Sequence, residues 1–287
     1  FFSDRENIKN SIIIKNKYLA NDWKLNVFQE FIGDKKLNKF KKLKISTNSR
    51  EKNNNKIFFG IKGKFFDGSN FSDEALKNGA KLAVVDKITK INKKKIKVKN
   101  TLSLLTEFSK KLRNSSNTCC VAITGSSGKT SLKELLGQCL KKKYSTVFSK
   151  DSYNNKFGLP ISLSNLNKNT NYGIFEIGMD KKGEIDYLSK IIKPEIGVIT
   201  NISYAHAKNF KSLIDIAKAK SEIINNIKLN GTIVLNRDDK FFNFFYKLAI
   251  KKKLKVISFG NHKDSNVRIV KIIKEKNTSI LYIKLDY

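Results

Sequence analysis

The chain of 287 residues is 40% hydrophobic, which is enough to fill two cored domains and excludes a mainly disordered protein. Its formal net charge of +33 admits a polyanionic partner, but the excess is mostly lysine spread over the whole chain, as compositional bias produces, and we expect no nucleic-acid partner. Three cysteines cannot form a disulfide framework, and no apolar run reaches the roughly 18–20 residues of a membrane span, so we expect a cytoplasmic monomer without a membrane span.

The first part of the chain predicts a small α/β unit. Short runs of apolar, β-branched and aromatic residues predict strands at 56–61 and 81–86. Between them, residues 73–78 follow a helical pattern that ends at Gly79, because glycine readily takes the left-handed conformation that closes a helix.

A polar stretch at 114–118 follows a predicted helix over 102–113 and indicates a domain boundary. We therefore expect an N-terminal domain over 1–117 and a second, incomplete domain over 118–287. Because the sequence begins with Phe1 and stops within a strand pattern, we interpret it as a fragment of a longer protein.

Beyond this boundary, apolar strands alternate with amphipathic helices, which predicts a mostly parallel sheet covered by helices on both faces. We expect its strands at 119–124, 172–177, 196–200, 232–235 and 255–259. An antiparallel pair is expected over 267–273 and 279–285, around Asn277. The chain as a whole is therefore predicted to be an α/β protein.

Two of the expected helices have a clear apolar face. The helix that begins at Lys129 places on one side Leu132, Leu135, Leu136, Cys139 and Leu140. The later helix carries Leu213, Ile216, Ile223, Ile224 and Ile227. Since Cys119 and Cys120 fall in an apolar run and Cys139 falls on the first of these faces, we expect all three thiols to be buried and reduced.

A glycine- and serine-rich loop connects the strand at 119–124 to the helix after it. The loop consists of Gly125, Ser126, Ser127, Gly128, Lys129, Thr130 and Ser131. Glycines let consecutive backbone N–H groups point at phosphate oxygens, and the helix adds its positive N-terminal end. We therefore expect nucleotide binding, with Lys129 on the β- and γ-phosphates and the Thr130 hydroxyl on Mg²⁺. The spacing differs from the standard phosphate loop, since Ile123 stands five residues before Gly128.

A phosphate loop of this short form is typical of the Mur ligases and the related folylpolyglutamate synthetases. The sequence resembles the Mur ligases from about Ile45 to Asp239. An Asn-rich segment at 152–160 ends in Gly-Leu-Pro, and a strand ending in Glu176 precedes the Gly-Glu-Ile of 183–185. These features resemble the MurF branch, which joins D-alanyl-D-alanine to UDP-N-acetylmuramoyl-tripeptide. The MurE branch has Ser-Ser-His after the glutamate, where this chain has Ile-Gly-Met.

Several polar residues are candidates for the catalytic centre. Glu176 ends an apolar strand, where an unpaired carboxylate is costly to bury and where parallel sheets bind ligands, so we expect it to hold a metal. The segment that ends at His206 resembles the family's strand end with a metal-binding histidine. Lys220 falls on the apolar face of its helix and matches the family's carbamylated lysine, whereas Lys218 points elsewhere. The resemblance implies as metal ligands Thr130, Glu176, His206 and carbamylated Lys220. It implies as catalytic residues Lys129, Lys220 and His206.

The segment 235–239 resembles the family's Asn-Ala-Asp-Asp stretch near the adenine of ATP. This resemblance implies an ATP contact for Asn236. Arg237 stands where the family usually has alanine.

The first unit resembles the family's UDP-binding signature at 47–50, 58–63 and 66–71. Asn48 and Ser69 depart from it, where aspartate and histidine are common. The resemblance implies precursor contacts for Ser49, Arg50, Lys62, Gly63, Asn154 and Asn155.

The resemblance implies an ATP- and Mg²⁺-dependent ligase that acts through an acyl phosphate in peptidoglycan precursor synthesis, with UDP-muramoyl-peptide and D-alanyl-D-alanine as its substrates. The family's C-terminal domain, which holds the incoming amino acid, is absent from this sequence, so we expect the fragment alone to turn over poorly. Three alternatives stay open: another branch of the superfamily that is MurE-like or folylpolyglutamate-synthetase-like, a basic phosphate-loop protein that binds nucleic acid, and a non-catalytic relative.

Overall fold

The computed structural model describes residues 28, 44–88, 90, 93–204, 209–274 and 278–286. The chain divides into two compact units, Phe1–Ser116 and Asn117–Tyr287. Each unit has its own sheet and its own buried apolar residues.

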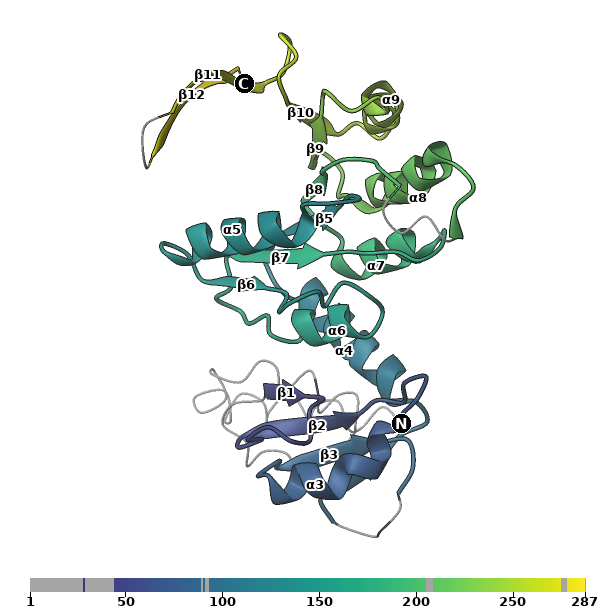
Figure 1. Ribbon diagram of the computed structural model, residues 1–287. Coiled ribbons are helices and arrows are strands. Elements are labelled where there is room, and N and C mark those ends of the chain that lie inside the picture. Colours follow the sequence, from purple (N-terminus) through teal and green to yellow (C-terminus); the bar gives the residue numbers. More distant parts are fainter. Residues whose placement is uncertain are drawn as a thin grey trace, which may run out of the picture. The chain divides into compact units, whose positions relative to one another are not determined.

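The described part of the first unit is built on a parallel sheet (Figure 1). Its strands, in sheet order, are β1 (Lys44–Ser46), β2 (Lys56–Gly60), β3 (Leu82–Val85) and β4 (Lys95–Lys97). Its helical segments are η2 (Gly68–Phe71), α3 (Ser72–Lys77) and α4 (Thr101–Asn114). The predicted strands and helices of this unit are confirmed to within a residue or two, and Gly79 follows α3 with a φ of 97°.

The central strand β2 is buried on both faces because its side chains alternate between two layers. Phe58 packs with Ala75 of α3. On the other face, the ring of Phe59 lies 5.9 Å from the ring of Phe28, which in turn lies 5.5 Å from Phe108 of α4, both in edge-to-face contact. Burial on both sides explains why β2 is a continuous apolar run and not an alternating one.

The second unit contains the larger sheet, with strand order β12-β11-β10-β9-β8-β5-β7-β6 in the described residues. The strands are β5 (Cys119–Thr124), β6 (Thr146–Phe148), β7 (Tyr172–Glu176), β8 (Ile196–Ile199), β9 (Thr232–Asn236), β10 (Lys255–Phe259), β11 (Val267–Lys274) and β12 (Ser279–Leu285). The helices are α5 (Lys129–Lys141), α6 (Gly158–Leu163), α7 (Glu184–Ile192), α8 (Leu213–Asn226) and α9 (Phe242–Lys251). All neighbouring strands are parallel except β11 and β12, so the predicted fold class is confirmed.

Helices cover both faces of this sheet, as predicted (Figure 1). On one face, α5 packs its leucines on a group of strand residues that consists of Val121, Ile123, Ile174 and Val198. On the other face, α6, α7, α8 and α9 bury side chains against residues such as Ala122, Phe175 and Leu235. The described ranges hold no helix that is both long and apolar enough to cross a membrane.

The buried side of α5 differs from the predicted one. Leu132, Leu136 and Leu140 pack against the sheet, but Leu135 is 63% exposed. Lys133 and Gly137 are buried in its place. A Cβ atom on Gly137 would come within 2.6 Å of the Phe148 ring of β6, so the helix lies too close to this strand there for a larger residue. The prediction was wrong because it assigned burial to apolar residues alone.

The prediction for the thiols was also wrong in part. Cys120 is buried in β5, as expected, and Cys119 is half-buried. Cys139 is exposed, because it lies on the same outward side of α5 as Leu135. None of the three cysteines, all of which lie in the described ranges, forms a disulfide.

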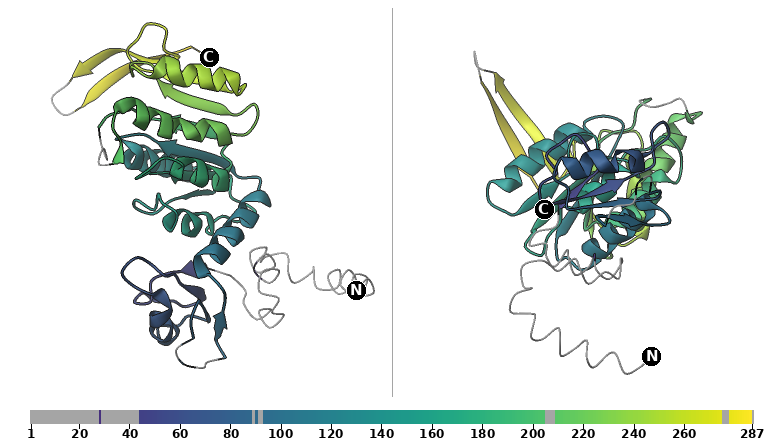
Figure 2. Two further views of the ribbon diagram at one scale, coloured as in Figure 1. Left: turned by 90° about the vertical axis from the view of Figure 1, so that its right-hand side faces the viewer. Right: turned by 90° about the horizontal axis from the view of Figure 1, so that it is seen from below.

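The antiparallel ribbon of β11 and β12 extends beyond the layered part of the second unit (Figures 1 and 2). β11 joins the sheet through the single register pair of Phe259 with Val267. Beyond that pair, the ribbon exposes large apolar side chains, namely Ile269, Val270, Ile272, Ile280, Leu281, Tyr282, Ile283 and Leu285. The predicted pairing is confirmed, and Asn277 lies outside the described residues.

Candidate active site

The glycine-rich loop connects β5 to α5 at the carboxyl end of the sheet. Gly125 has a φ of 149° and Gly128 a φ of 78°, both in the region that favours glycine. Gly128 is also the cap residue of α5, so it has no side chain that could accept a hydrogen bond from the first turn of the helix. Ser131 is exposed in that turn. This end of α5 therefore presents backbone N–H groups and a positive dipole to an anion.

The strand order places this loop at a switch point. From β5 the chain forms β6 and β7 on one side of β5 and then returns to form β8 on the other side. In open α/β sheets, ligands bind in the crevice at the carboxyl ends of such strands. The register pairs Ile123 with Glu176 and Thr124 with Ile199, so the carboxyl ends of β7 and β8 flank the loop.

Residues that follow β8 hold the loop in shape. The Thr200 hydroxyl donates a 2.6 Å hydrogen bond to the carbonyl of Ser127. The Asn201 side chain accepts from the backbone N–H of Ser127 at 3.1 Å. Ser126 is 4% exposed, and its hydroxyl donates to the Ser203 carbonyl at 2.9 Å. Side chains outside the loop therefore fix its backbone, which preorganises it for a ligand.

Glu176 lies next to the phosphate loop. It is the last residue of β7 and is 1% exposed. One carboxylate oxygen accepts a 2.7 Å hydrogen bond from the Thr130 hydroxyl, and the other accepts a 2.8 Å bond from the Asn154 amide. The structure thus brings together a hydroxyl and a carboxylate that sequence analysis placed on one metal ion.

The oxygen donors fit Mg²⁺, which takes one or two carboxylates and completes its shell with water and substrate phosphates. Thr130 and Glu176 supply such donors beside the loop. Among the residues that the structure describes, no group of three or more His, Cys, Asp or Glu side chains could hold a metal ion. A metal that shares these donors with a ligand's phosphates matches this arrangement better than an all-protein cage. The predicted ligand His206 lies outside the described residues.

Two lysine side chains converge on one backbone carbonyl of the loop. The ammonium groups of Lys129 and Lys220 each donate a 2.9 Å hydrogen bond to the oxygen of Gly125. Burial, and after it the neighbouring positive charge of Lys129, together lower the pKa of Lys220 to about 7. Burial also lowers the pKa of Lys129, against the opposing attraction of Glu176. Lys218 is exposed on the outer side of α8.

A pocket of about 410 Å³ opens beside Glu176. It is lined by Asn154, Asn155, Lys156, Phe157, Gly178, Met179, Asp180, Gly183, Glu184, Tyr187 and Leu188. The side-chain oxygen of Asn155 accepts hydrogen bonds from the backbone N–H groups of Phe157 and Gly158 at the start of α6, so this side chain also shapes the pocket wall. The Asn154 amide connects the same wall to Glu176.

The segment at the carboxyl end of β9 carries the predicted adenine contact. Asn236 ends β9, and its side chain accepts from the backbone N–H of Asp238 at 3.0 Å. The Arg237 side chain donates to His262 at 3.2 Å and stacks on the Phe242 ring, 4.9 Å from its centre. The unusual arginine therefore has partners within its own loop region and is accommodated there.

The predicted precursor contacts of the first unit lie around the ends of its strands and helices. Ser49 is buried, and its hydroxyl donates a 2.6 Å hydrogen bond to Glu74 of α3. Arg50 is exposed. Lys62 forms an isolated antiparallel bridge with Asp67, and the N–H of Gly63, within that turn, donates to Phe66 at 2.8 Å. Their roles in binding stay predictions.

Comparison with known proteins assigns the chain to a family. Residues 123–285 match the Mur ligase middle domain, and residues 44–144 match the catalytic domain of the Mur ligase family. The chain belongs to the Mur ligase family. The family match covers the phosphate loop, Glu176 and Lys220, so it includes every described residue of the site around Gly125.

Several Mur ligases are similar to the chain over most of its length. The UDP-N-acetylmuramoyl-tripeptide–D-alanyl-D-alanine ligase of Buchnera aphidicola subsp. Baizongia pistaciae is 36% identical over 225 residues, which is 78% of this chain and 48% of that protein. The crystal structure of MurF from Acinetobacter baumannii superposes with a TM-score of 0.78 at 28% identity, covering 92% of this chain and 58% of that one. MurF from Thermotoga maritima in complex with ADP gives a TM-score of 0.72 at 28% identity, covering 84% and 56%. The chain spans about half the length of the curated relatives it matches.

Two residues that support this site, Asn201 and Lys133, were not predicted from the sequence. Asn201 holds the phosphate loop, and its position two residues after the end of β8 was the available signal. Lys133 is 0% exposed, and its ammonium donates to the carbonyls of Ser149 and Asp151, at the start of the segment that leads to Asn154. Its one signal was the spacing of four residues from Lys129, which places both side chains on one side of α5.

Proposed function

We propose that this chain is the nucleotide-binding and precursor-binding part of an ATP-dependent ligase that joins D-alanyl-D-alanine to UDP-N-acetylmuramoyl-tripeptide in peptidoglycan precursor synthesis. The observation that carries the proposal is the 2.7 Å contact between Thr130 and Glu176 beside a phosphate loop. Support also comes from the similarity to ligases of that name and to a MurF structure that holds ADP.

The chemistry required is the activation of a carboxylate. The γ-phosphoryl group of ATP passes to the terminal carboxylate of the tripeptide, and ADP leaves with the electron pair of the broken P–O bond. The amine of the dipeptide then attacks the acyl carbon, loses its proton, and forms an amide as inorganic phosphate departs. A carboxylate alone is a poor acyl donor, because an oxide-like oxygen leaves badly.

The residues of this chain serve that reaction chiefly by positioning and by charge neutralisation. The N–H groups at the start of α5 and the Lys129 ammonium would bind the phosphates. Thr130 and Glu176 would hold a Mg²⁺ ion, which supplies further neutralisation of the phosphate charge when it is bound.

Lys220 would take a second role in the same centre. With a pKa of about 7, a large share of its amine is neutral near neutral pH. A neutral amine can add CO₂ to form a carbamate with release of one proton, which converts a buried cation into an anion able to bind a metal. Lys220 is 4% exposed, so the carbamate would be shielded from solvent.

The pocket beside Glu176 is the proposed place for the peptide end of the precursor, with Asn154 and Asn155 on its wall. Ser49, Arg50, Lys62 and Gly63 of the first unit are the proposed contacts for the UDP end. An elongated, anionic precursor also suits a chain whose net charge is +33.

The test measures phosphate release from ATP by the protein that contains this chain. We expect release only when UDP-muramoyl-tripeptide is present, and a stoichiometric amide product only when D-alanyl-D-alanine is added as well. An amide product with a single amino acid in place of the dipeptide would assign the chain to another branch of the family. Phosphate release that depends on an oligonucleotide and not on the precursor would refute the proposal altogether.

A further inference from the structure

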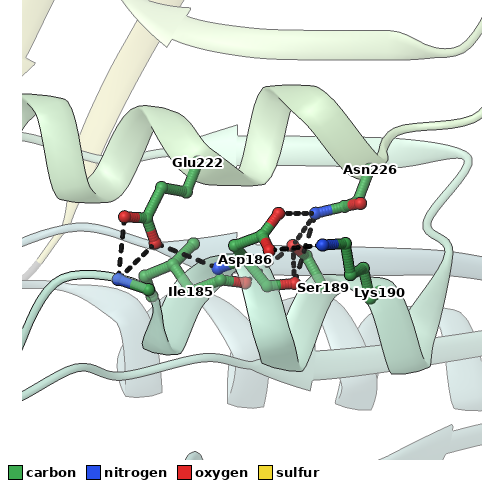
Figure 3. Close-up of polar contacts among 7 residues, drawn as sticks. Ile185, Asp186, Ser189, Lys190, Glu222 and Asn226 are labelled. Atoms are coloured by element: carbon green, nitrogen blue, oxygen red, sulfur yellow. Dashed lines mark hydrogen bonds and ion pairs between the residues drawn. The ribbon is translucent and has the colours of Figure 1, made fainter.

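The N-terminal turn of α7 is capped by a side chain from another helix. Gly183, the cap residue of α7, has a φ of 90° and supplies no side-chain acceptor. The Glu222 carboxylate of α8 instead accepts hydrogen bonds from the N–H of Gly183 at 2.8 and 3.1 Å and from the N–H of Asp186 at 3.1 Å (Figure 3). A carboxylate at this position also interacts favourably with the positive end of the helix dipole.

One turn further along α8, Asn226 makes a second kind of contact with α7. Its amide donates to the Asp186 carboxylate at 2.9 Å and to the Ser189 hydroxyl at 2.8 Å (Figure 3). Partial burial pushes the pKa of Asp186 up, but hydrogen bonds from Lys190 and Asn226 and the charge of Lys190 outweigh it and hold the pKa below its ordinary value. Asn226 thus forms a second link between α7 and α8, which shares Asp186 with the link from Glu222 and adds Ser189.

Glu222 and Lys220 face different neighbours because they lie two residues apart on one helix. Two residues correspond to roughly 200° of rotation about a helix axis. Accordingly, Lys220 reaches the carbonyl of Gly125 in the phosphate loop, while Glu222 reaches the turn at Gly183. α8 itself is anchored in the core by residues such as Ile223, which is 0% exposed.

The turn that Glu222 holds is part of the pocket wall. Asp180, Gly183 and Glu184 line the pocket beside Glu176. The Glu184 carboxylate accepts from the N–H of Asp180 at 2.6 Å, so the turn is closed on itself as one unit. Glu222 therefore connects this unit to α8, the helix that carries Lys220, through the N–H groups of Gly183 and Asp186.

We propose that Glu222 is a positioning residue, which sets the distance between the pocket wall at Gly183 and the centre around Lys220. It touches neither the phosphate loop nor the pocket interior, and it acts through the backbone of α7. This inference rests on the proposed function, in which one precursor molecule must reach from the pocket to the phosphate loop. A displaced wall would weaken precursor binding and leave nucleotide binding intact.

The experiment compares Glu222→Ala, Glu222→Gln and the control Asn226→Ala in the 287-residue chain. Amide hydrogen exchange is measured at Gly183 and Asp186, and calorimetry measures the affinities for UDP-muramoyl-tripeptide and for ATP with Mg²⁺. Glu222→Ala should speed hydrogen exchange at both amides by about tenfold, because the loss of a helix cap lowers the stability of the first helical turn by about that factor. We expect precursor affinity to fall by about tenfold and ATP affinity to stay within about twofold.

The glutamine variant keeps one acceptor oxygen, so it should restore both the exchange rates and the precursor affinity to within about threefold of the parent chain. Asn226→Ala should lower the thermal midpoint without selective loss of precursor affinity. The proposal is overturned if Glu222→Ala leaves exchange and precursor affinity unchanged, or if it lowers the precursor and ATP affinities together. If the parent chain fails to bind the precursor, the proposed function fails, and hydrogen exchange still decides the positioning role by itself.

Discussion

Lys133 offers a sharp test of how the active site is supported. It is a fully buried cation in α5, one turn after the phosphate loop. Its ammonium donates to the carbonyls of Ser149 at 2.7 Å and Asp151 at 2.6 Å, and it pairs with Glu134 at 2.8 Å. The hydroxyl of Ser149 accepts from the N–H of Glu176 at 3.4 Å. We predict that Lys133→Met destabilises the second unit and loosens this segment.

The magnitude follows from the hydrogen bonds that are lost. Each bond from a charged donor contributes roughly 1.5–3 kcal/mol, so the two carbonyls together account for about 3–6 kcal/mol. Burial of the methionine side chain should offset roughly 1–2 kcal/mol of this loss, and no more, because methionine adds little apolar area beyond the buried lysine stem. The expected loss in the free energy of unfolding of the second unit is therefore about 1–5 kcal/mol.

Native-state hydrogen exchange of the β5 and β7 amides measures this loss in the second unit alone. Glu134→Gln is the matched control, since the Glu134 side chain is 37% exposed and its ion pair should contribute under about 1 kcal/mol. A Lys133→Met chain as stable as the parent, or no less stable than the Glu134→Gln chain, would refute the reasoning that the buried ammonium holds the segment.

Three more predictions address the site directly. Glu176→Gln should weaken ATP binding in the presence of Mg²⁺ by tenfold or more, roughly the loss seen when metal-site carboxylates are altered, and leave ADP binding in EDTA unchanged by calorimetry. The pKa of Lys220 is about 7 in the folded chain and about 10.5 in the unfolded one, so between these pH values unfolding takes up a proton. The free energy of unfolding should therefore rise with pH from about 7 to about 10. Urea titrations should show that Lys220→Met removes this part of the pH dependence. Gly125 has a φ of 149°, and a Cβ atom there would collide with the Thr200 hydroxyl, so Gly125→Ala should lower the free energy of unfolding of the second unit by roughly 1–3 kcal/mol in urea titrations. A Cβ atom on Gly128 meets open space, so Gly128→Ala should lower it by less.

The phosphate loop and Glu176 could be predicted from sequence because their signals are local. A strand, a glycine-rich turn and an amphipathic helix follow each other without interruption around Gly125. The carboxyl ends of parallel strands meet at one edge, so a glutamate at the end of a later strand had to lie near that turn if the strands were neighbours. Lys220 was separable from Lys218 because helical periodicity places only one of them on the apolar face.

The supporting residues were beyond such reasoning because their partners are distant in sequence. Glu222 caps a helix that begins 38 residues before it, and no sequence pattern at either position predicts the contact. The buried ammonium of Lys133 has three acceptors, which hydrophobic periodicity does not reveal, so the prediction assigned the buried place to Leu135. Short strands such as β6 also escape periodicity, since three residues do not define a period.

The ribbon of β11 and β12 has a practical consequence for handling the chain. Its outer strand offers unpaired N–H and C=O groups together with side chains such as Leu281 and Ile283, each about half exposed. Such an edge is a template for pairing with another copy, so concentrated samples should self-associate through it. Light scattering across a dilution series would reveal this, and a lysine at Leu281 should suppress it without reaching the nucleotide site.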